Sequence, residues 1–144
     1  MRKLRALFTL LLAIIMIVSC LTAQAADLET NEDPTIIDEY KNIGNFTVSF
    51  LVFSSGKTQS SALVSTYNIY DNISLTLNLQ RSIDGGTWSS LFTWTASGSG
   101  TVSKTGFRYV TPGYYYRCVA YVTIRTSSGT FVESTYATSN VTHY

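Results

Sequence analysis

The chain has little of what catalysis, metal binding and disulfide frameworks require. Its 144 residues include one histidine and two cysteines. The histidine, His143, stands next to the last residue, in a region where chains usually fray. One such histidine cannot supply the base of a Ser-His-Asp or Cys-His arrangement, and no spacing of His, Cys, Asp and Glu matches a metal site. The sequence therefore predicts a protein that is not an enzyme and uses no metal or cofactor.

Carboxylates are equally scarce in the second part of the chain. Beyond residue 44 they are Asp71, Asp84 and Glu133. Asp71 and Asp84 fall in predicted turns, and alternation along its strand directs Glu133 outward together with Thr135. A glycosidase needs two carboxyl groups within about 5–10 Å of each other on a sugar cleft. Nothing in this spacing indicates such a pair.

The first residues have the layout of an export signal. Three cations within the first five residues precede an apolar run over residues 6–18, and small residues follow up to Ala25. This three-part order is typical of a secretory signal peptide, and the run is shorter than the about 20 residues that a membrane-spanning helix needs. We predict a helical signal peptide over residues 1–25, cleavage after Ala25, and a secreted, extracellular protein.

The two cysteines leave an alternative to simple secretion. Residues 17–20 (Ile-Val-Ser-Cys) loosely fit the motif at which a signal peptidase cuts before a lipid-carrying cysteine. A lipid on Cys20 would anchor the protein to the cell surface and would be its one contact with a membrane. Cys118 has no second cysteine to pair with once the leader is removed. The lack of a disulfide favours a bacterial exporter, because small secreted eukaryotic domains usually contain disulfides.

Residues 26–44 differ in composition from residues 45–144. They contain six acids, a proline and no base before Lys41. Such a stretch cannot bury enough apolar surface to order itself, so we predict an acidic flexible linker at 26–44 and one domain at 45–144. Without the leader, seven basic residues stand against nine acidic ones, a net charge of −2. This charge excludes nucleic acid as a partner.

The sequence of residues 45–144 predicts an all-β domain. Hydrophobic and polar residues alternate with period two, and Ser, Thr, Val, Tyr and Phe dominate. In the clearest example, Ile73, Leu75, Leu77 and Leu79 alternate with polar residues, which predicts a half-buried strand. Turn residues recur at 55–57, 84–86, 97–100, 112–113 and 127–129. The predicted strands cover residues 46–53, 61–69, 73–80, 87–95, 101–110, 114–126 and 131–141. About seven strands at this spacing are typical of a single antiparallel β-sandwich.

One corner of the predicted sandwich has a recognisable sequence. Residues 110–118 (Val-Thr-Pro-Gly-Tyr-Tyr-Tyr-Arg-Cys) place Tyr116 four positions after Pro112. This pattern resembles the corner between the fifth and sixth strands of immunoglobulin and fibronectin type III domains. The resemblance implies an immunoglobulin/fibronectin III-like sandwich in which the Tyr116 hydroxyl bonds back to the corner. Cys118 stands where an immunoglobulin domain carries a bridging cysteine, but it lacks a partner and is expected to be a small core residue.

A second resemblance covers most of residues 46–144. Its motifs are Leu79-Gln80-Arg81, Asp84-Gly85-Gly86-Thr87-Trp88, Thr93-Trp94, the Gly-Ser-Gly turn, Tyr109-Val110, Gly113-Tyr114-Tyr115-Tyr116-Arg117, and Ser128-Gly129 before Glu133. In this order and spacing they resemble a family of short secreted proteins from Gram-positive anaerobic bacteria. That family has no assigned function, so the resemblance implies a location and a fold and no catalytic residue.

Two aromatic patches are candidates for binding. Alternation over residues 87–95 directs Trp88, Phe92 and Trp94 to one face and Leu91 to the other. Coplanar aromatics at this spacing could stack on sugar rings, as in a carbohydrate-binding module. The same pattern is also typical of one wall of a sandwich core, where buried aromatic side chains contribute most of the stabilising energy.

The second patch comes from residues 114–126. Alternation there turns Tyr115, Arg117, Tyr121 and Arg125 outward and Tyr116 and Cys118 inward. Tyr and Arg are enriched at the centres of protein interfaces, although a solvent-facing sheet has a similar composition. The sequence thus predicts a secreted or cell-surface, non-catalytic module for an extracellular protein or glycan, or a structural role. The alternatives are a sugar-binding module using Trp88 and Trp94 and, more remotely, a small β-rich toxin whose hairpins insert into membranes.

Overall fold

The computed structural model describes residues 40–144, in which all regular structure is β. The predicted signal peptide at 1–25, its cleavage site at Ala25, Cys20 and most of the predicted linker lie outside the described residues. Within the described part no helix is long and apolar enough to cross a membrane. The prediction of an all-β domain is confirmed.

Eight strands follow one another along the described chain. They are β1 (Ile43–Val52), β2 (Lys57–Thr66), β3 (Asn72–Ser82), β4 (Ser89–Ser99), β5 (Thr101–Tyr109), β6 (Tyr115–Arg125), β7 (Phe131–Thr138) and β8 (Thr142–His143). β1 takes in Ile43 and Gly44, which the composition placed in the linker. Tyr40, before the strand, already packs against the core.

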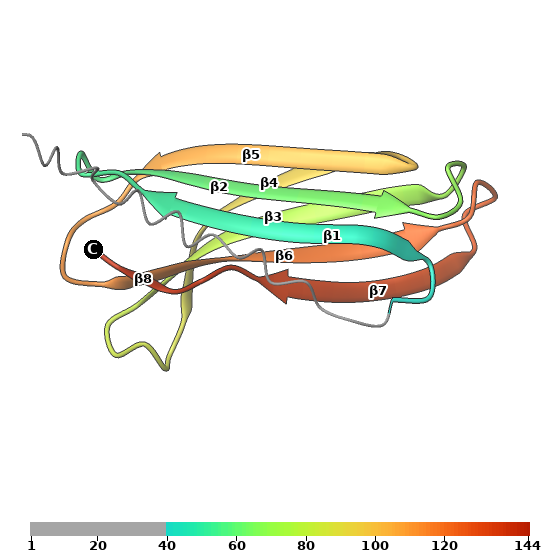
Figure 1. The fold of residues 1–144 in the computed structure, drawn as a ribbon. Coiled ribbons are helices and arrows are strands. Elements are labelled where there is room, and N and C mark those ends of the chain that lie inside the picture. The colour runs from blue at the N-terminus through green and yellow to red at the C-terminus, as the bar shows by residue number, and fades with distance from the viewer. Residues whose placement is uncertain (1–39) are drawn as a thin grey trace, which may run out of the picture. The chain divides into compact units, whose positions relative to one another are not determined.

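The strands form two antiparallel sheets (Figure 1). One sheet has the order β1-β2-β5, and the other has the order β4-β3-β6-β7 with the short β8 paired to β6. Neighbours in sequence do not always share a sheet, since β2 and β3, β4 and β5, and β5 and β6 each lie in different sheets. The two sheets cover each other and form the two layers of the fold.

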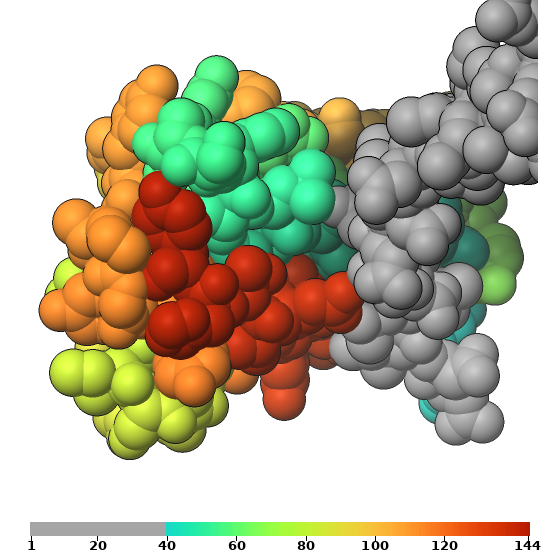
Figure 2. All heavy atoms as spheres, turned by 60° about the vertical axis from the view of Figure 1, so that its left-hand side comes forward, coloured from blue at the N-terminus to red at the C-terminus, as the bar shows by residue number. Residues whose placement is uncertain are grey.

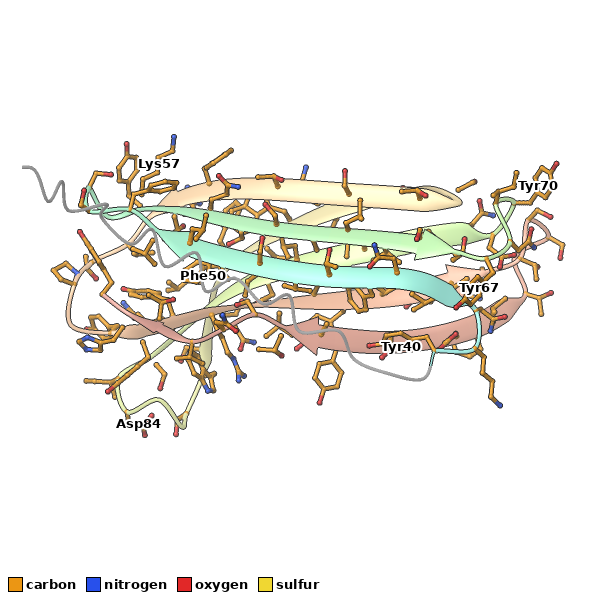
Figure 3. All side chains as sticks on the ribbon, in the orientation of Figure 1. Tyr40, Phe50, Lys57, Tyr67, Tyr70 and Asp84 are labelled. Atoms are coloured by element: carbon orange, nitrogen blue, oxygen red, sulfur yellow. The ribbon has the colours of Figure 1, made fainter. Side chains whose placement is uncertain are left out.

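Alternate residues of the strands fill the space between the sheets. In β3, Leu75, Leu77 and Leu79 are no more than 1 % exposed, while the residues between them face outward. Phe50 of β1 lies between the layers in Figure 3. The core also contains Ile43, Phe46, Val48, Ala62, Val64, Ile73, Val102, Tyr116, Cys118, Ala120, Val122, Ile124 and Ala137. Burial of such side chains is the main stabilising contribution to a fold that lacks a disulfide in its described part.

Gly100 carries the chain from one sheet to the other. The sequence predicts a four-residue turn at 97–100, but β4 continues to Ser99 and β5 begins at Thr101. The backbone of Gly100 has a positive φ of 72°, and a Cβ there would lie 2.8 Å from the carbonyl oxygen of Ile69. Only glycine meets both conditions without strain. With glycine at this position, one residue is enough to carry the chain from β4 in one sheet to β5 in the other.

Several predicted strands have different ends in the structure, among them the second and the last. β2 begins at Lys57 rather than 61, and the polar residues Thr58 and Ser60 in this added part are fully buried. The predicted last strand, 131–141, is interrupted after Thr138. There Ser139 pairs with Cys118 instead: its hydroxyl accepts a hydrogen bond from the Cys118 amide, and its own amide donates to the Cys118 carbonyl.

The corner before β6 has the geometry that the sequence suggested. Tyr116 is 1 % exposed, and its hydroxyl donates a hydrogen bond of 2.6 Å to the carbonyl of Thr111. Gly113, next to Pro112, has a φ of 89° and turns the chain toward β6. The bond ties the start of β6 to the connection from the other sheet.

Candidate functional site

An extra residue in β4 separates the three aromatics that the sequence placed on one face. Phe92 pairs with Leu79 and Ser90 pairs with Gln80, so Leu91 has no partner in β3. Such a bulge reverses the faces of all residues on one side of it. The predicted common face is therefore wrong: Phe92 and Trp94 face inward with Leu79 and Leu77, whereas Trp88 lies on the outer side.

Trp94 and Phe92 belong to the interior. Trp94 packs against the core, and its indole occupies the space that a side chain at Gly106 of β5 would take. The rings of Phe92 and Trp94 meet edge to face at 4.8 Å. Neither ring is available as part of an outward platform for a sugar.

Trp88 joins the second predicted patch instead. The guanidinium of Arg117 lies over its indole, 4.1 Å from the ring centre. The Nε of Arg117 also donates a 2.8 Å hydrogen bond to the side-chain oxygen of Gln80 on β3. Two partners hold this arginine in place, and such a contact between cation and ring contributes about 0.5–2 kcal/mol.

The four residues predicted on the outer face of β6 do lie there, but each has a different neighbour. Tyr115 contacts His143 of β8 edge to face at 4.6 Å. The ring of Tyr121 lies 5.9 Å from that of Tyr136 on β7. Arg125 donates from its guanidinium to the carbonyl of Gly129 at 3.1 Å.

We define the outer patch as Trp88, Arg117, Tyr121, Tyr136 and Gln80. Tyr121 and Tyr136 are 46 % and 59 % exposed, and they are opposite each other in the pairing of β6 with β7. Threonine and serine side chains continue the face alongside them, for example Thr123, whose hydroxyl lies 3.3 Å from that of Ser134. The patch thus combines exposed aromatic rings with an arginine that is already held in position.

Sequence reasoning missed Tyr136, Gln80 and His143 as members of this face. Alternation within β7 cannot place Tyr136 opposite Tyr121, because that position depends on the register of β6 and β7. The register is also irregular, with a shift between Ile124 and Arg125. No signal within either strand alone indicates this pairing.

The same register corrects the predicted direction of Glu133. Glu133 pairs with Ile124, a fully buried core residue, and so lies on the inward side of β7. Its carboxylate accepts hydrogen bonds from the amide and the side chain of Asn42. Thr135 pairs with the buried Val122 in the same way. The predicted outward direction of Glu133 and Thr135 is therefore wrong.

The two other carboxylates of the described residues have structural partners, and the cysteine is buried. Backbone donation from Thr87, then the hydroxyl of Ser82 and the amide of Gly86, lowers the pKa of Asp84 to about 2. Asp71 is buried and accepts from the side chain of Asn68 at 2.9 Å. Burial raises the pKa of the Cys118 thiol to about 12, so it stays protonated at neutral pH. Among the described residues no three of His, Cys, Asp and Glu form a group that could hold a metal.

The described part of the chain is basic. Residues 40–144 contain seven Lys and Arg against three Asp and Glu, a net charge of +4, whereas the predicted mature chain is acidic overall. Several cations lie on aromatic rings, as Arg81 does on Tyr114 and Lys57 on Phe107.

Three connections lie at the same end of the sandwich, as Figure 2 shows: the turn at 53–57, the loop at 83–88 and the corner at 110–114. Lys57 and Asp84 are both at this end in Figure 3.

No protein-family profile matches this chain, and a search of curated proteins found no significant match.

Proposed function

We propose that this protein is a secreted or cell-surface, non-catalytic binding module, and that the outer patch is its binding surface for an extracellular protein. The observation that carries the proposal is that the exposed Tyr121–Tyr136 pair lies on the same face of the sheet as Arg117, whose guanidinium is fixed four residues earlier on β6. Tyrosine, tryptophan and arginine are the residues that most often dominate binding energy at protein interfaces. Side chains already held in place lose little freedom on binding.

The proposed fold class is an immunoglobulin/fibronectin III-like sandwich. The bond from Tyr116 to Thr111 and the position of Cys118 two residues later support it. In the immunoglobulin constant arrangement the fourth strand shares a sheet with the first, second and fifth. Here β4 pairs with β3 in the other sheet, so this edge strand differs from the immunoglobulin constant arrangement.

A sugar platform made of Trp88, Phe92 and Trp94 is not part of this proposal. The bulge at Leu91 leaves Trp88 on the outer face and directs the other two rings into the sandwich. One face of the Trp88 ring is covered by Arg117. A glycan is therefore an outcome to be tested on the outer patch as a whole.

Binding to cells of the producing bacterium tests the proposal. We expect the double variant Tyr121→Ala/Tyr136→Ala to lower the binding of the fluorescently labelled protein about tenfold or more. Tyr70→Ala is the matched control, because Tyr70 is 70 % exposed and is not part of the outer patch. It lies in the loop between β2 and β3, at the end of the sandwich opposite to Lys57 and Asp84 (Figure 3). Equal binding by the double variant and the control would refute the patch.

Treatment of the cells identifies the class of partner. Protease digestion of the cell surface should abolish binding if the partner is a protein. Loss of binding after periodate oxidation, with resistance to protease, would replace the protein by a glycan.

Export and anchoring are proposed from the first residues of the sequence alone. Mass spectrometry of the released protein should find Ala26 as its first residue. A diacylglyceryl group on Cys20 would show that the protein is anchored to the cell surface by a lipid.

A further inference from the structure

A pocket opens between the edge strands of the two sheets. β4 and β5 are joined at Gly100, and β4 and β5 are the edges of their sheets on this side. Trp94 fills the space between them at Gly106, in the middle of β5. Beyond Trp94, a pocket of about 240 Å³ is lined by Leu79, Leu91, Phe92, Arg108, Tyr109 and Val110.

The pocket is a consequence of the same bulge that divides the aromatics. Leu91 has no partner in β3, remains 40 % exposed and lines one side. Leu79, which is 1 % exposed, connects the pocket to the core. A space of this size corresponds to about eight water molecules at roughly 30 Å³ each, which is enough for a phenyl or branched aliphatic group.

Arg108 adds a charge to these apolar walls. It pairs with Thr58, whose hydroxyl donates to the Arg108 carbonyl at 2.9 Å, and this register turns its side chain toward the space between the sheets. The guanidinium lies 3.6 Å from the ring centre of Phe92. Stacking covers one face of the guanidinium, and its N–H groups, which lie in the plane of the guanidinium, are not used by the stack.

We propose that this pocket binds a small carboxylate with an apolar substituent. The apolar group would lie against Leu79, Leu91 and Val110, and the carboxylate would accept two parallel hydrogen bonds from Arg108. A free aromatic or branched-chain acid and the C-terminal residue of a peptide share this chemistry. The pocket lies between the sheets, away from the outer patch, so the inference does not rest on the proposed function.

Titration of the ¹⁵N-labelled protein, in the form that expressing cells release, tests the site by NMR. The probes are phenylacetate, its neutral isostere phenylacetamide, and the peptides acetyl-Gly-Gly-Phe with a free or an amidated C-terminus. We expect phenylacetate to shift amides around Leu79, Leu91 and Arg108 with millimolar affinity, of the order that a ligand of about ten heavy atoms reaches. The amide should bind about tenfold more weakly.

Two variants of β5 separate the charge from the fold. Arg108→Gln should lower phenylacetate affinity about tenfold while the rest of the spectrum is preserved. Lys104→Gln is the matched control, because Lys104 also pairs on the inward side of β5, with Ala62, but does not line the pocket. It should leave the affinity unchanged.

The peptides distinguish the two sources of the ligand. Tighter binding of the free-acid peptide than of phenylacetate would identify the C-terminus of a protein as the ligand, and the reverse would identify a free acid. No shift with any probe at 20 mM, about the weakest binding that such a titration detects, would overturn the inference. So would equal affinity for acid and amide.

Discussion

At the scale of single residues, the hydroxyl of Tyr116 joins the start of β6 to the connection that comes from β5 in the other sheet. Its bond to Thr111 is short, at 2.6 Å, and the ring around it is buried. We expect Tyr116→Phe to lower the free energy of unfolding by about 1 kcal/mol, which is the usual net contribution of one intramolecular hydrogen bond. Urea denaturation measures the change.

Tyr114→Phe is the control for that variant. The Tyr114 ring stacks under Arg81 and packs edge to face against Tyr116, and the substitution keeps both contacts. We expect a change of less than about 0.5 kcal/mol. An equal loss in the two variants would mean that the hydrogen bond of Tyr116 contributes nothing specific.

Cys118 makes the stability depend on pH in the alkaline range. Burial raises the thiol pKa from 9.0 to about 12, and the Ser60 hydroxyl beside it offsets only part of this. Above pH 9 the unfolded chain loses this proton while the folded chain keeps it, so the unfolded state binds fewer protons and stability falls as pH rises. We expect the fall between about pH 9 and 12, with a slope of at most about 1.4 kcal/mol per pH unit.

The contribution of Cys118 is isolated by comparison with Cys118→Ala. Unfolding by urea at a series of pH values should show a smaller alkaline decline in the variant. In addition, the native thiol should not react with a disulfide reagent at pH 8 until urea unfolds the protein. Rapid reaction under native conditions would show that the thiol is accessible.

At the scale of elements, the two edge strands β4 and β5 decide how the open side of the sandwich is closed. Trp94 lies directly on Gly106, and Arg108 lies on Phe92. Lys104 and Arg108 are also on the inward side of β5. Inward-pointing charges on an edge strand oppose pairing with a second chain.

Gly106→Ala tests the contact between these strands. A Cβ at this position overlaps the indole of Trp94, which is held by packing on the core and by Phe92. We expect a loss of about 1–3 kcal/mol, as for other overpacked cores, and a red shift of the tryptophan fluorescence. Ser103→Ala, on the exposed side of the same strand, should change neither. An unchanged spectrum in Gly106→Ala would show that Trp94 is not held there.

At the scale of the whole described domain, neither sheet is made from a continuous piece of chain. β2 pairs with β5 through Lys57 and Tyr109, and the chain between them contributes to the other sheet. β3 pairs with β6 in the same way. Because long loops must close before these pairs form, we expect single-exponential refolding in about milliseconds to seconds.

Stopped-flow tryptophan fluorescence and far-UV circular dichroism measure this folding together. The two signals should follow one transition, because the core belongs to both sheets. Two separable transitions would mean that each sheet is stable by itself. Refolding in microseconds would contradict the non-local topology.

The local features of the domain could be predicted from the sequence. Alternation identified the inward residues of β3 and β6, and glycine, proline and aspartate marked most of the turns. The spacing of Pro112 and Tyr116 indicated the corner whose hydrogen bond is present. These features depend on residues near one another in the chain, so the sequence contains the information that determines them.

The candidate sites depended on contacts between distant strands. Alternation counts positions within one strand, and it cannot detect that Leu91 has no partner in β3 or that the register of β7 shifts at Arg125. Each such irregularity moves every residue on one side of it to the opposite face. For this reason the sequence by itself determined the strands, most turns and the buried rows of β3 and β6. Only the tertiary structure separated Trp88 from Trp94, placed Tyr136 beside Tyr121 and formed the pocket at Arg108.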